Sequence, residues 1–340
     1  MSINDKNINN LFLYWLITSL ILVFFIIIIG GLTRLTNSGL SITEWELFKG
    51  IFPPLNQNTW ESYFNQYKKI PQFQFLNHNM NLNEFKIIFY WEYFHRFIAR
   101  IIGLFFLIPL IYFYFSKSIK KKYIYISFNI LFLIIIQGAI GWYMVQSGLI
   151  NDISVSHYRL AIHLVLAIII IASIFWLILN IRMKSYRFFF SFKKKNLPYL
   201  FLILLIFLQI IFGAFVSGLD AGKIYQTWPL MGHTYFPNDI IFNKSESFDF
   251  NKHSLVQFYH RNLAYLITFY ILCLAIYIHK KHLIGLYNAI RLLIIFLLIQ
   301  VILGIFTLLS GLNIFLASAH QITSVILVFS AINLYYLQAK

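Results

Sequence analysis

Eight long apolar stretches, separated by polar loops, dominate the pattern of hydrophobic and polar positions along the chain. Each is close to the length of about 20 residues that a helix needs to cross about 30 Å of hydrocarbon. The pattern therefore predicts an all-α polytopic membrane protein with eight transmembrane helices. The predicted spans are Leu11–Gly31, Phe89–Phe115, Tyr123–Val145, Tyr158–Ile181, Leu197–Val216, Leu255–Ile278, Ala289–Leu309 and Ile314–Leu337.

The composition agrees with a protein whose solvent is mostly lipid. Of its 340 residues, 60% are hydrophobic and 11% are charged, against roughly 45–50% and 25% in soluble domains. These values exclude an ordinary cytosolic enzyme, a disordered chain and a fibrous one. Cys273 is the one cysteine, so an intrachain disulfide, a Cys-ligated zinc site and a Cys-ligated iron–sulfur cluster are excluded as well. We expect Cys273, in the middle of a helix, to be a packing residue.

The distribution of the formal charge of +16 indicates membrane topology and not nucleic-acid binding. Fifteen Lys and Arg residues fall in the set of loops that includes both termini, and eight fall in the other, much longer set. By the positive-inside rule both termini are then cytoplasmic, and the long loop at residues 33–88 is on the outer side. The basic loops would contact anionic membrane lipids. A nucleic-acid face would need these residues gathered on a soluble surface, which the pattern does not predict.

The two halves of the chain carry the same signals in the same order, which indicates an internal repeat. The matching signals, first half and then second, are His95-Arg96 and His260-Arg261, Gln137 with Gly141 and Gln300 with Gly304, and His163 and His320. Four spans per half is an even number, so both halves would insert in the same orientation, unlike the inverted repeats of many transporters. We therefore predict two parallel-repeat four-helix bundles, at residues 1–195 and 196–340.

Four of the ten histidines share one predicted depth in the membrane, one to two turns inside the outer end of an even-numbered span. These are His95, His163, His260 and His320. Five others lie in loops and are interpreted as solvated, namely His78, His233, His253, His279 and His282. His157, at the edge of the fourth span, is left without a role. A single intramembrane histidine is often a packing residue, but four at one depth, repeated in two halves, indicate a functional site.

Two facing imidazoles inside an apolar bundle can ligate a haem iron from both sides. This chemistry pairs His95 with His163 and His260 with His320, so each bundle would contain one haem-sized site near the outer face. Zinc is the weaker interpretation, because two histidines per half and no cysteine leave a structural zinc site short of ligands.

Charged and small residues near these sites fit the same interpretation. Haem propionates need cations when partly buried, and four arginines are placed to supply them: Arg34, Arg96, Arg159 and Arg261. The alternative for each arginine is an interfacial anchor that reaches the headgroups. The glycines at positions 30, 31, 138, 141, 213 and 304 would let a flat macrocycle or a neighbouring helix approach closely, and helix packing alone explains them equally well.

The two halves differ at one position. Glu92 is three residues before His95, whereas the equivalent residue of the second half is Gln257, which cannot ionise. A carboxylate beside a porphyrin could relay protons or stabilise developing positive charge. The alternative is an ion pair with Arg96, one turn away on the same helix. The asymmetry suggests that one half does chemistry while the other holds a cofactor.

Together, these motifs resemble the haem A synthase family, in its mitochondrial and proteobacterial branch, over nearly the whole chain. The residues that carry the resemblance are Gly30–Thr36, Ser38–Ser41, Pro53–Asn56, Trp60-Glu61, Glu92-x-x-His95-Arg96, Arg159-Leu160-Ala161-x-His163, Gly218–Gly222, Thr227–Met231, His260-Arg261 and His320-Gln321. Another branch of the family carries a cysteine pair in an outer loop. This chain has none there, so a thiol-based step is unsupported.

The resemblance implies a bacterial inner-membrane oxidoreductase that converts a ring methyl of haem O, through hydroxylation, to the formyl group of haem A for cytochrome oxidase. It implies haem b as the cofactor of the C-terminal half, with His260 and His320 as iron ligands. The substrate haem would bind His95 and His163, and Glu92 occupies the family's catalytic position. Electrons would leave toward haem b and then to an acceptor that the sequence does not name. Haem O synthase and cytochrome oxidase assembly factors are implied partners.

The residues without the resemblance leave three classes of protein open. A membrane oxidoreductase would hold one haem permanently and release the other in modified form. An electron-transfer cytochrome would retain two haem b groups. A haem transporter would use the repeat as a pore and pass haem across the membrane unchanged.

Overall fold

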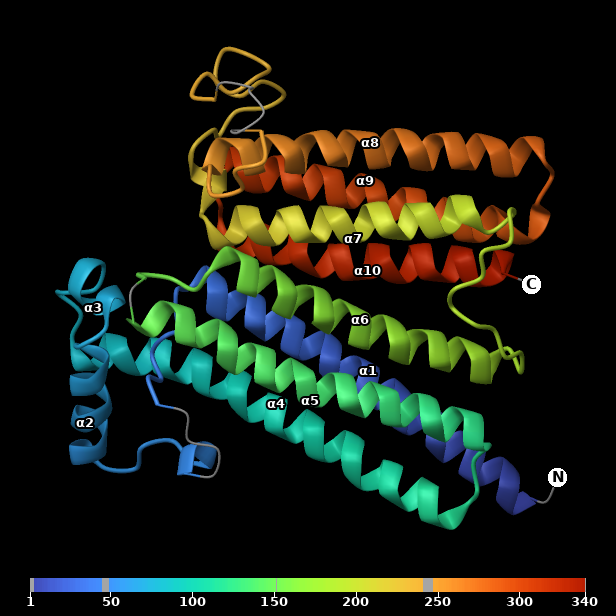
Figure 1. Cartoon of the computed structure of the whole chain (residues 1–340), viewed down its shortest axis with the longest axis horizontal. Coiled ribbons are helices and arrows are strands. Elements are labelled where there is room, and N and C mark those ends of the chain that lie inside the picture. Colours follow the sequence, from blue (N-terminus) through green and yellow to red (C-terminus); the bar gives the residue numbers. More distant parts are fainter. Residues whose placement is uncertain (1–2, 45–48, 151, 241–246, 340) are drawn as a thin grey trace. The chain divides into compact units, whose positions relative to one another are not determined.

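The computed structural model describes residues 3–44, 49–150, 152–240 and 247–339, and it is helical through most of these ranges (Figure 1). Eight helices in the described residues are long and apolar enough to cross a membrane, so the predicted all-α polytopic membrane protein is confirmed. The parallel orientation of its two halves remains a prediction. The eight helices are α1 (Ile3–Leu35), α4 (Leu82–Ser116), α5 (Lys121–Ile150), α6 (His157–Arg182), α7 (Leu197–Gly218), α8 (His253–Lys280), α9 (Tyr287–Leu309) and α10 (Ile314–Gln338).

Helix α4 begins seven residues before the predicted span because its first turn is capped by side chains. The Asn81 side chain accepts hydrogen bonds from the backbone N–H groups of Asn83 and Glu84, and the Glu84 carboxylate accepts one from the N–H of Asn81. This capping box satisfies backbone donors that would otherwise lack partners. A search for apolar stretches cannot detect a helix start that depends on polar residues.

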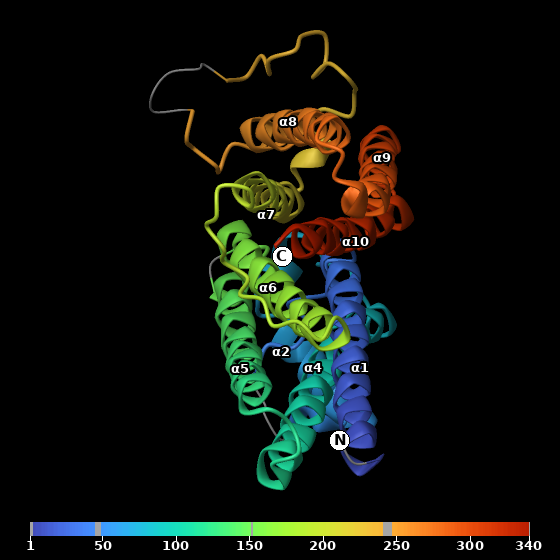
Figure 2. The ribbon, with the colours of Figure 1, turned by 90° about the vertical axis from the view of Figure 1, so that its right-hand side faces the viewer.

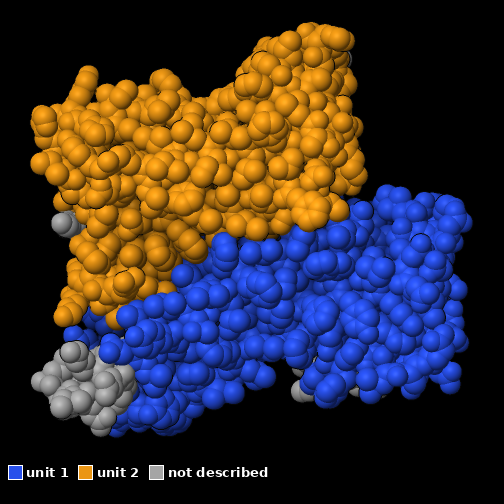
Figure 3. Space-filling model, turned by 180° about the vertical axis from the view of Figure 1, so that it is seen from behind, with its two compact units in different colours: residues 1–174 blue, residues 175–340 orange. Residues whose placement is uncertain are grey.

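The chain divides into two compact units, residues 1–174 and 175–340 (Figure 3). The first contains α1, α4, α5 and most of α6, and the second contains the end of α6 and α7 to α10 (Figure 2). The division at residue 195 remains a prediction. In the second unit, close backbone contacts join α7 to α8, α8 to α9, α9 to α10 and α10 to α7, which closes the bundle.

The close backbone contacts of the first unit are distributed differently. They join α1 to α4 and α4 to α5, but among the described residues no contact of similar extent joins α6 to either α1 or α5. Helix α6, half of whose apolar span is buried, therefore reaches its neighbours in this unit mainly through side chains.

The outer loop of the first unit folds into a small helical layer that the sequence did not predict. It contains α2 (Gln57–Tyr67), α3 (Pro71–Phe75) and a 3-10 turn at Lys49–Ile51. An aromatic cluster packs this layer onto the first turns of α4; its buried members are Leu40, Ile42, Trp60, Phe64, Tyr67, Ile70, Phe85, Phe89 and Tyr93. Burial of this cluster holds the segment around Ile42 against α4.

A chain of polar contacts ties this layer to the end of α1. Asn77 Nδ2 donates to the Tyr67 hydroxyl, which donates to Gln72 Oε1, and Gln72 Nε2 donates to the backbone carbonyl of Asn37. Burial raises the pKa of Tyr67 above its ordinary value of 10.0, so this hydroxyl keeps its proton and donates. Arg34 Nη1 continues the chain by donating to Asn37 Oδ1 at 3.0 Å.

Candidate functional site

The four histidines at the predicted depth lie on α4, α6, α8 and α10, and they form two pairs. His95 and His163 lie in the first unit, and His260 and His320 lie in the second. Each unit therefore carries one of the pairs that the sequence suggested, and ligation by these pairs remains a prediction.

Each of these histidines packs against a glycine on a neighbouring helix. A Cβ atom built on Gly30 would lie 3.0 Å from His95 Cε1. The same distance is 3.0 Å for Gly141 and His163, 3.2 Å for Gly213 and His260, and 2.8 Å for Gly304 and His320. Any larger residue would displace the imidazole, so each glycine leaves the space that a ring occupies. We call these four glycine–histidine contacts the glycine cradles. Gly138, also expected to allow close approach, has open space at its Cβ position instead.

Three of the four rings also contact a glutamine one turn before the glycine. Gln137 Nε2 lies 3.2 Å from both ring nitrogens of His163 and donates to the backbone carbonyl of that histidine at 3.1 Å. Gln209 Nε2 lies 3.1 Å from His260 Nδ1 and donates to the His260 carbonyl at 3.0 Å. The sequence analysis missed Gln209, although it stands four residues before Gly213, the spacing already noted at Gln137.

The third glutamine contact has a different geometry. His320 Nδ1 lies 3.1 Å from the backbone carbonyl of Gln300, and Gln300 Nε2 lies 3.3 Å from His320 Nε2. Thr323 donates its hydroxyl to Gln300 Oε1. A backbone carbonyl that accepts from Nδ1–H places the lone pair of the ring on Nε2, which is the atom that the Gln300 amide contacts.

His95 is the exception among the four. Position 26 of α1, four residues before Gly30, is Ile26 and not glutamine. The Nδ1 atom of His95 is buried and has no hydrogen-bond partner in the described part of the chain. Its ring rests against Gly30.

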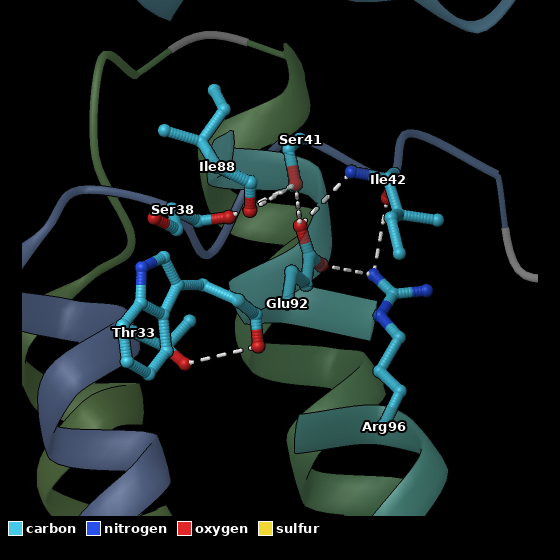
Figure 4. A network of polar contacts seen from close by, with 8 residues as sticks. Thr33, Ser38, Ser41, Ile42, Ile88, Glu92 and Arg96 are labelled. Carbon is cyan, nitrogen blue, oxygen red and sulfur yellow. Dashed lines mark hydrogen bonds and ion pairs between the residues drawn. The ribbon is translucent and has the colours of Figure 1, made fainter. Parts of the chain in front are cut away.

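Glu92 is 2% exposed and lies at the centre of a polar network (Figure 4). Its Oε2 accepts from the Ser41 hydroxyl at 2.7 Å and from the N–H of Ile42 at 2.9 Å. Its Oε1 accepts from Arg96 Nη2 at 2.5 Å, so the ion pair weighed as an alternative is present. Arg96 also donates to the Ile42 carbonyl at 3.0 Å. Both backbone polar groups of Ile42, in the outer loop, are therefore held by the Glu92–Arg96 pair.

The second unit has the same arrangement with an amide in place of the carboxylate. Gln257 is 2% exposed, and its Nε2 donates to the backbone carbonyl of Tyr225 at 2.8 Å. Arg261 Nη2 donates to the same carbonyl at 2.9 Å, and its Nη1 donates to the Thr227 carbonyl at 2.9 Å. Gln257 and Arg261 thus bind the outer loop of this half through neutral carbonyl acceptors.

The two other arginines assigned to propionates also contact protein oxygens. Arg34 donates to Asn37, as described above. Arg159 donates to the Tyr143 carbonyl at 2.7 Å, and its guanidinium carbon lies 3.8 Å from the centre of the Tyr143 ring. Binding of a propionate by any of the four arginines remains a prediction.

Among the described residues, the other six histidines and Cys273 do not pack against a glycine as these four histidines do. All five loop histidines are exposed, as predicted. His157 is buried and its ring centre lies 4.0 Å from that of Tyr158. Cys273 is exposed on the surface of α8, so its expected packing role is wrong. The described residues contain no group of three or more His, Cys, Asp or Glu side chains able to hold a metal.

The fold and the two paired-histidine sites define a class: polytopic membrane proteins that carry two intramembrane imidazole pairs in two four-helix units. A family model described as "Cytochrome oxidase assembly protein" matches residues 13–332. This chain belongs to that family.

Curated relatives cover nearly the full length of the chain. A protein of Pelagibacter ubique named "Heme A synthase" is 48% identical over 338 residues, 97% of each chain. Proteins with the same name from Rickettsia canadensis and Flavobacterium johnsoniae are 41% and 40% identical, over 95% and 93% of this chain and 96% and 94% of their own.

Proposed function

We propose that this chain is a haem A synthase, a membrane oxidoreductase that converts a ring methyl of haem O to the formyl group of haem A for cytochrome oxidase. The observation that carries the proposal is a buried carboxylate, Glu92, one turn from a paired histidine in one half only. The names of the full-length relatives support the same reaction. An electron carrier would have no need for this asymmetry.

The residues present fit haem as a ligand. Each pair supplies two imidazoles from different helices, and each imidazole rests against a glycine that leaves room for it. His95 and His163 would hold the substrate haem in the half that contains Glu92, with Arg34, Arg96 and Arg159 near its propionates. His260 and His320 would hold haem b, with Arg261 nearby. When bound, haem b supplies a one-electron redox centre.

Glu92 is placed to accept a proton or to stabilise positive charge as the methyl group is oxidised. Its Oε2 receives two hydrogen bonds and is fixed by them, whereas Oε1 receives one from the described residues, donated by Arg96. A carboxylate oxygen has two lone pairs, so Oε1 is the atom that would take the proton. The outer-loop segment at Ser41 and Ile42 covers the carboxylate and excludes water from it.

The topology proposed from the charge pattern places the protein in a bacterial inner membrane with both termini in the cytoplasm. Both sites then lie near the outer face, where haem O from haem O synthase would arrive and haem A would leave for assembly factors of cytochrome oxidase. The electron acceptor beyond haem b is left open.

The test is extraction and chromatography of the haems bound to the purified protein from cells that make haem O. Haem b together with haem O, haem A or hydroxylated intermediates is the expected result. Two haem b groups per chain, with no other haem, would replace the proposal with an electron-transfer cytochrome.

A further inference from the structure

The connector between α6 and α7, residues 183–196, has a buried face and an exposed aromatic face. Residues 185–193 are non-helical. The Phe189 ring packs between the ends of α6 and α10, with its centre 5.0 Å from that of Trp176 and 5.7 Å from that of Tyr335. The alternate residues on either side are each more than 70% exposed, namely Phe188, Phe190 and Phe192. Side chains one residue apart on an extended segment point to opposite faces, which accounts for this alternation.

Hydrogen bonds to the backbone hold the connector in this orientation. The Tyr335 hydroxyl donates to the carbonyl of Phe189 and accepts from the N–H of Ser191 at 3.3 Å. Trp176 Nε1 donates to the carbonyl of Arg187 at 2.9 Å. A shift of the connector by one residue would bury the exposed phenylalanines, but it would break these bonds. The three phenylalanines therefore stay exposed because the backbone that carries them is fixed.

The position of the connector places its aromatic face in contact with lipid. It joins α6 and α7, two helices that are long and apolar enough to cross a membrane. It therefore lies at one boundary of the hydrocarbon, on the side of both termini in the topology proposed above. Aromatic side chains exposed at this boundary contact lipid headgroups and the adjoining part of the acyl chains. The exposed face of the connector is thus an apolar surface that a lipid can cover.

Three exposed lysines follow the aromatic face, directly before the first turn of α7: Lys193, Lys194 and Lys195. The N-terminus of a helix carries partial positive charge, so cations at this position do not stabilise α7. The sequence contains no acidic residue from position 153 to position 219, so the segment is strongly basic. The charge of the lysines and that of the helix terminus both favour an anionic group beside the aromatic face.

A second lysine triplet shows that this combination is not a general property of the basic loops. Lys120, Lys121 and Lys122 stand at the start of α5, on the same side in the proposed topology, and are also exposed. The one apolar residue of their loop, Ile119, is buried. This loop offers charge without an exposed apolar face, whereas the connector offers both.

We propose that residues 188–195 form a binding site for an anionic phospholipid. The headgroup of the lipid contacts the three lysines, and its acyl chains lie against the three phenylalanines. The sequence predicts contact with anionic lipids for every basic loop, whereas this proposal assigns a specific site to one of them. The inference goes beyond the proposed function and does not depend on it, because lipid binding is measured without enzyme turnover.

The experiment measures lipid affinity in the full-length protein, purified with the haem that it binds and freed of lipid in a neutral detergent. Phosphatidylglycerol is titrated into each sample, and native mass spectrometry gives the Kd of the first bound lipid. Phosphatidylcholine and inorganic phosphate are titrated in the same way. The charge variant combines Lys193→Gln, Lys194→Gln and Lys195→Gln, the aromatic variant combines Phe188→Ser, Phe190→Ser and Phe192→Ser, and the control variant combines Lys120→Gln, Lys121→Gln and Lys122→Gln.

The charge variant should bind phosphatidylglycerol on the order of 100-fold more weakly than wild type, because each lysine near an anionic lipid contributes about fivefold to affinity. The aromatic variant should bind it about tenfold more weakly, since apolar contact area is lost. The control variant should bind it as wild type does. Wild type should bind phosphatidylcholine much more weakly than phosphatidylglycerol, and inorganic phosphate should not displace the lipid.

Equal weakening in the charge variant and the control variant would overturn the proposal, because binding would then follow total charge and not this site. Wild-type affinity in the aromatic variant, or displacement of the lipid by an equal concentration of inorganic phosphate, would show a site for phosphate alone and would overturn it as well. Equal affinity of wild type for the two lipids would have the same consequence. If the aromatic variant does not fold, Phe190→Ser takes its place, and it should weaken binding about threefold.

Discussion

The two halves hold their outer loops with equivalent residue pairs, but the polarity of one contact is reversed. In the first half Glu92 accepts from the backbone N–H of Ile42 and from Ser41. In the second half Gln257 donates to the carbonyl of Tyr225. Arg96 and Arg261 each donate a hydrogen bond to a loop carbonyl, the first to Ile42 and the second to Tyr225. The two halves thus share one arrangement of helix and loop. They differ in that the Glu92 carboxylate can accept a proton, whereas the Gln257 amide cannot.

The largest effect should come from removing a haem b ligand. His260→Ala and His320→Ala should each abolish retention of haem b, because no other described side chain of the second unit is paired with the remaining histidine. Extraction of haem from purified protein measures this, with His279→Ala, at the exposed end of α8, as the control. Normal haem b content in either variant would end the assignment of these ligands.

Making the first half resemble the second should remove catalysis. Glu92→Gln keeps the size of the side chain but deletes the charge, so conversion of haem O should fall about 100-fold or more, the usual contribution of a general acid or base. Haem content should be retained. Glu84→Gln, which preserves the cap of the same helix, should convert haem O normally. Full conversion by Glu92→Gln would leave that residue with the ion-pair role alone.

Ser41 should contribute less than the carboxylate that it holds. A hydrogen bond to a charged group is worth roughly 1.5–3 kcal/mol, so Ser41→Ala should lower haem O conversion by about tenfold or more, and Ser41→Thr should restore part of it. Ser127→Ala, whose hydroxyl bonds only within α5, serves as the control in the same assay. Equal rates for both alanine variants would show that Ser41 does not position Glu92.

The glycine cradles should tolerate substitution according to the space at each Cβ position. Gly304→Ala would place a methyl group 2.8 Å from His320 Cε1, so haem b should be retained less well than in wild type. Gly213→Ala, at 3.2 Å, should have a smaller effect. Gly138→Ala meets open space and should leave haem content unchanged in the same extraction. A greater loss of haem b from Gly213→Ala than from Gly304→Ala would contradict the cradle interpretation.

The outer loop of the second half should show the smallest, pH-dependent effect. Burial raises the pKa of Asp239, but hydrogen bonds from Ser254 and Tyr225 and the charge of Lys252 lower it further, so the net pKa is below its ordinary value of 3.8. A lowered pKa adds stability above that value and loses it as pH falls through the folded-state pKa. Asp239→Asn should therefore unfold at a lower temperature than wild type at pH 7, and the difference in unfolding temperature should narrow toward pH 3. A difference in unfolding temperature that does not change with pH would contradict a stabilising role of the Asp239 charge.

The membrane helices were predictable because they rest on a local regularity. Apolar length alone gave the eight spans, and the repeat of His-Arg and of Gln with Gly is the basis of the pairing that stays a prediction. The outer layer was missed because α2 and α3 are short and are held by contacts far apart in sequence, such as Trp60 with Phe89. Hydropathy carries no signal of this kind.

The contacts of the arginines were also beyond sequence reasoning. The carbonyls that Arg96 and Arg261 bind belong to loops whose path depends on the tertiary fold, and no spacing rule identifies them. Gln209 is the opposite case. Its signal was present in the sequence, four residues before Gly213, but it is aligned with Ile26 in the first half, so a search for matching pairs passed over it.

The buried Nδ1 atom of His95, which has no hydrogen-bond partner among the described residues, has a consequence for how much of the protein a cell can maintain. Such an atom costs folding free energy, and a ligand that binds beside it can offset that cost. A ligand present at 100 times its Kd adds about 2.7 kcal/mol to the stability of the folded form. The first unit would be most resistant to degradation when haem O is plentiful. The supply of substrate would then set the abundance of the enzyme without any change in gene expression.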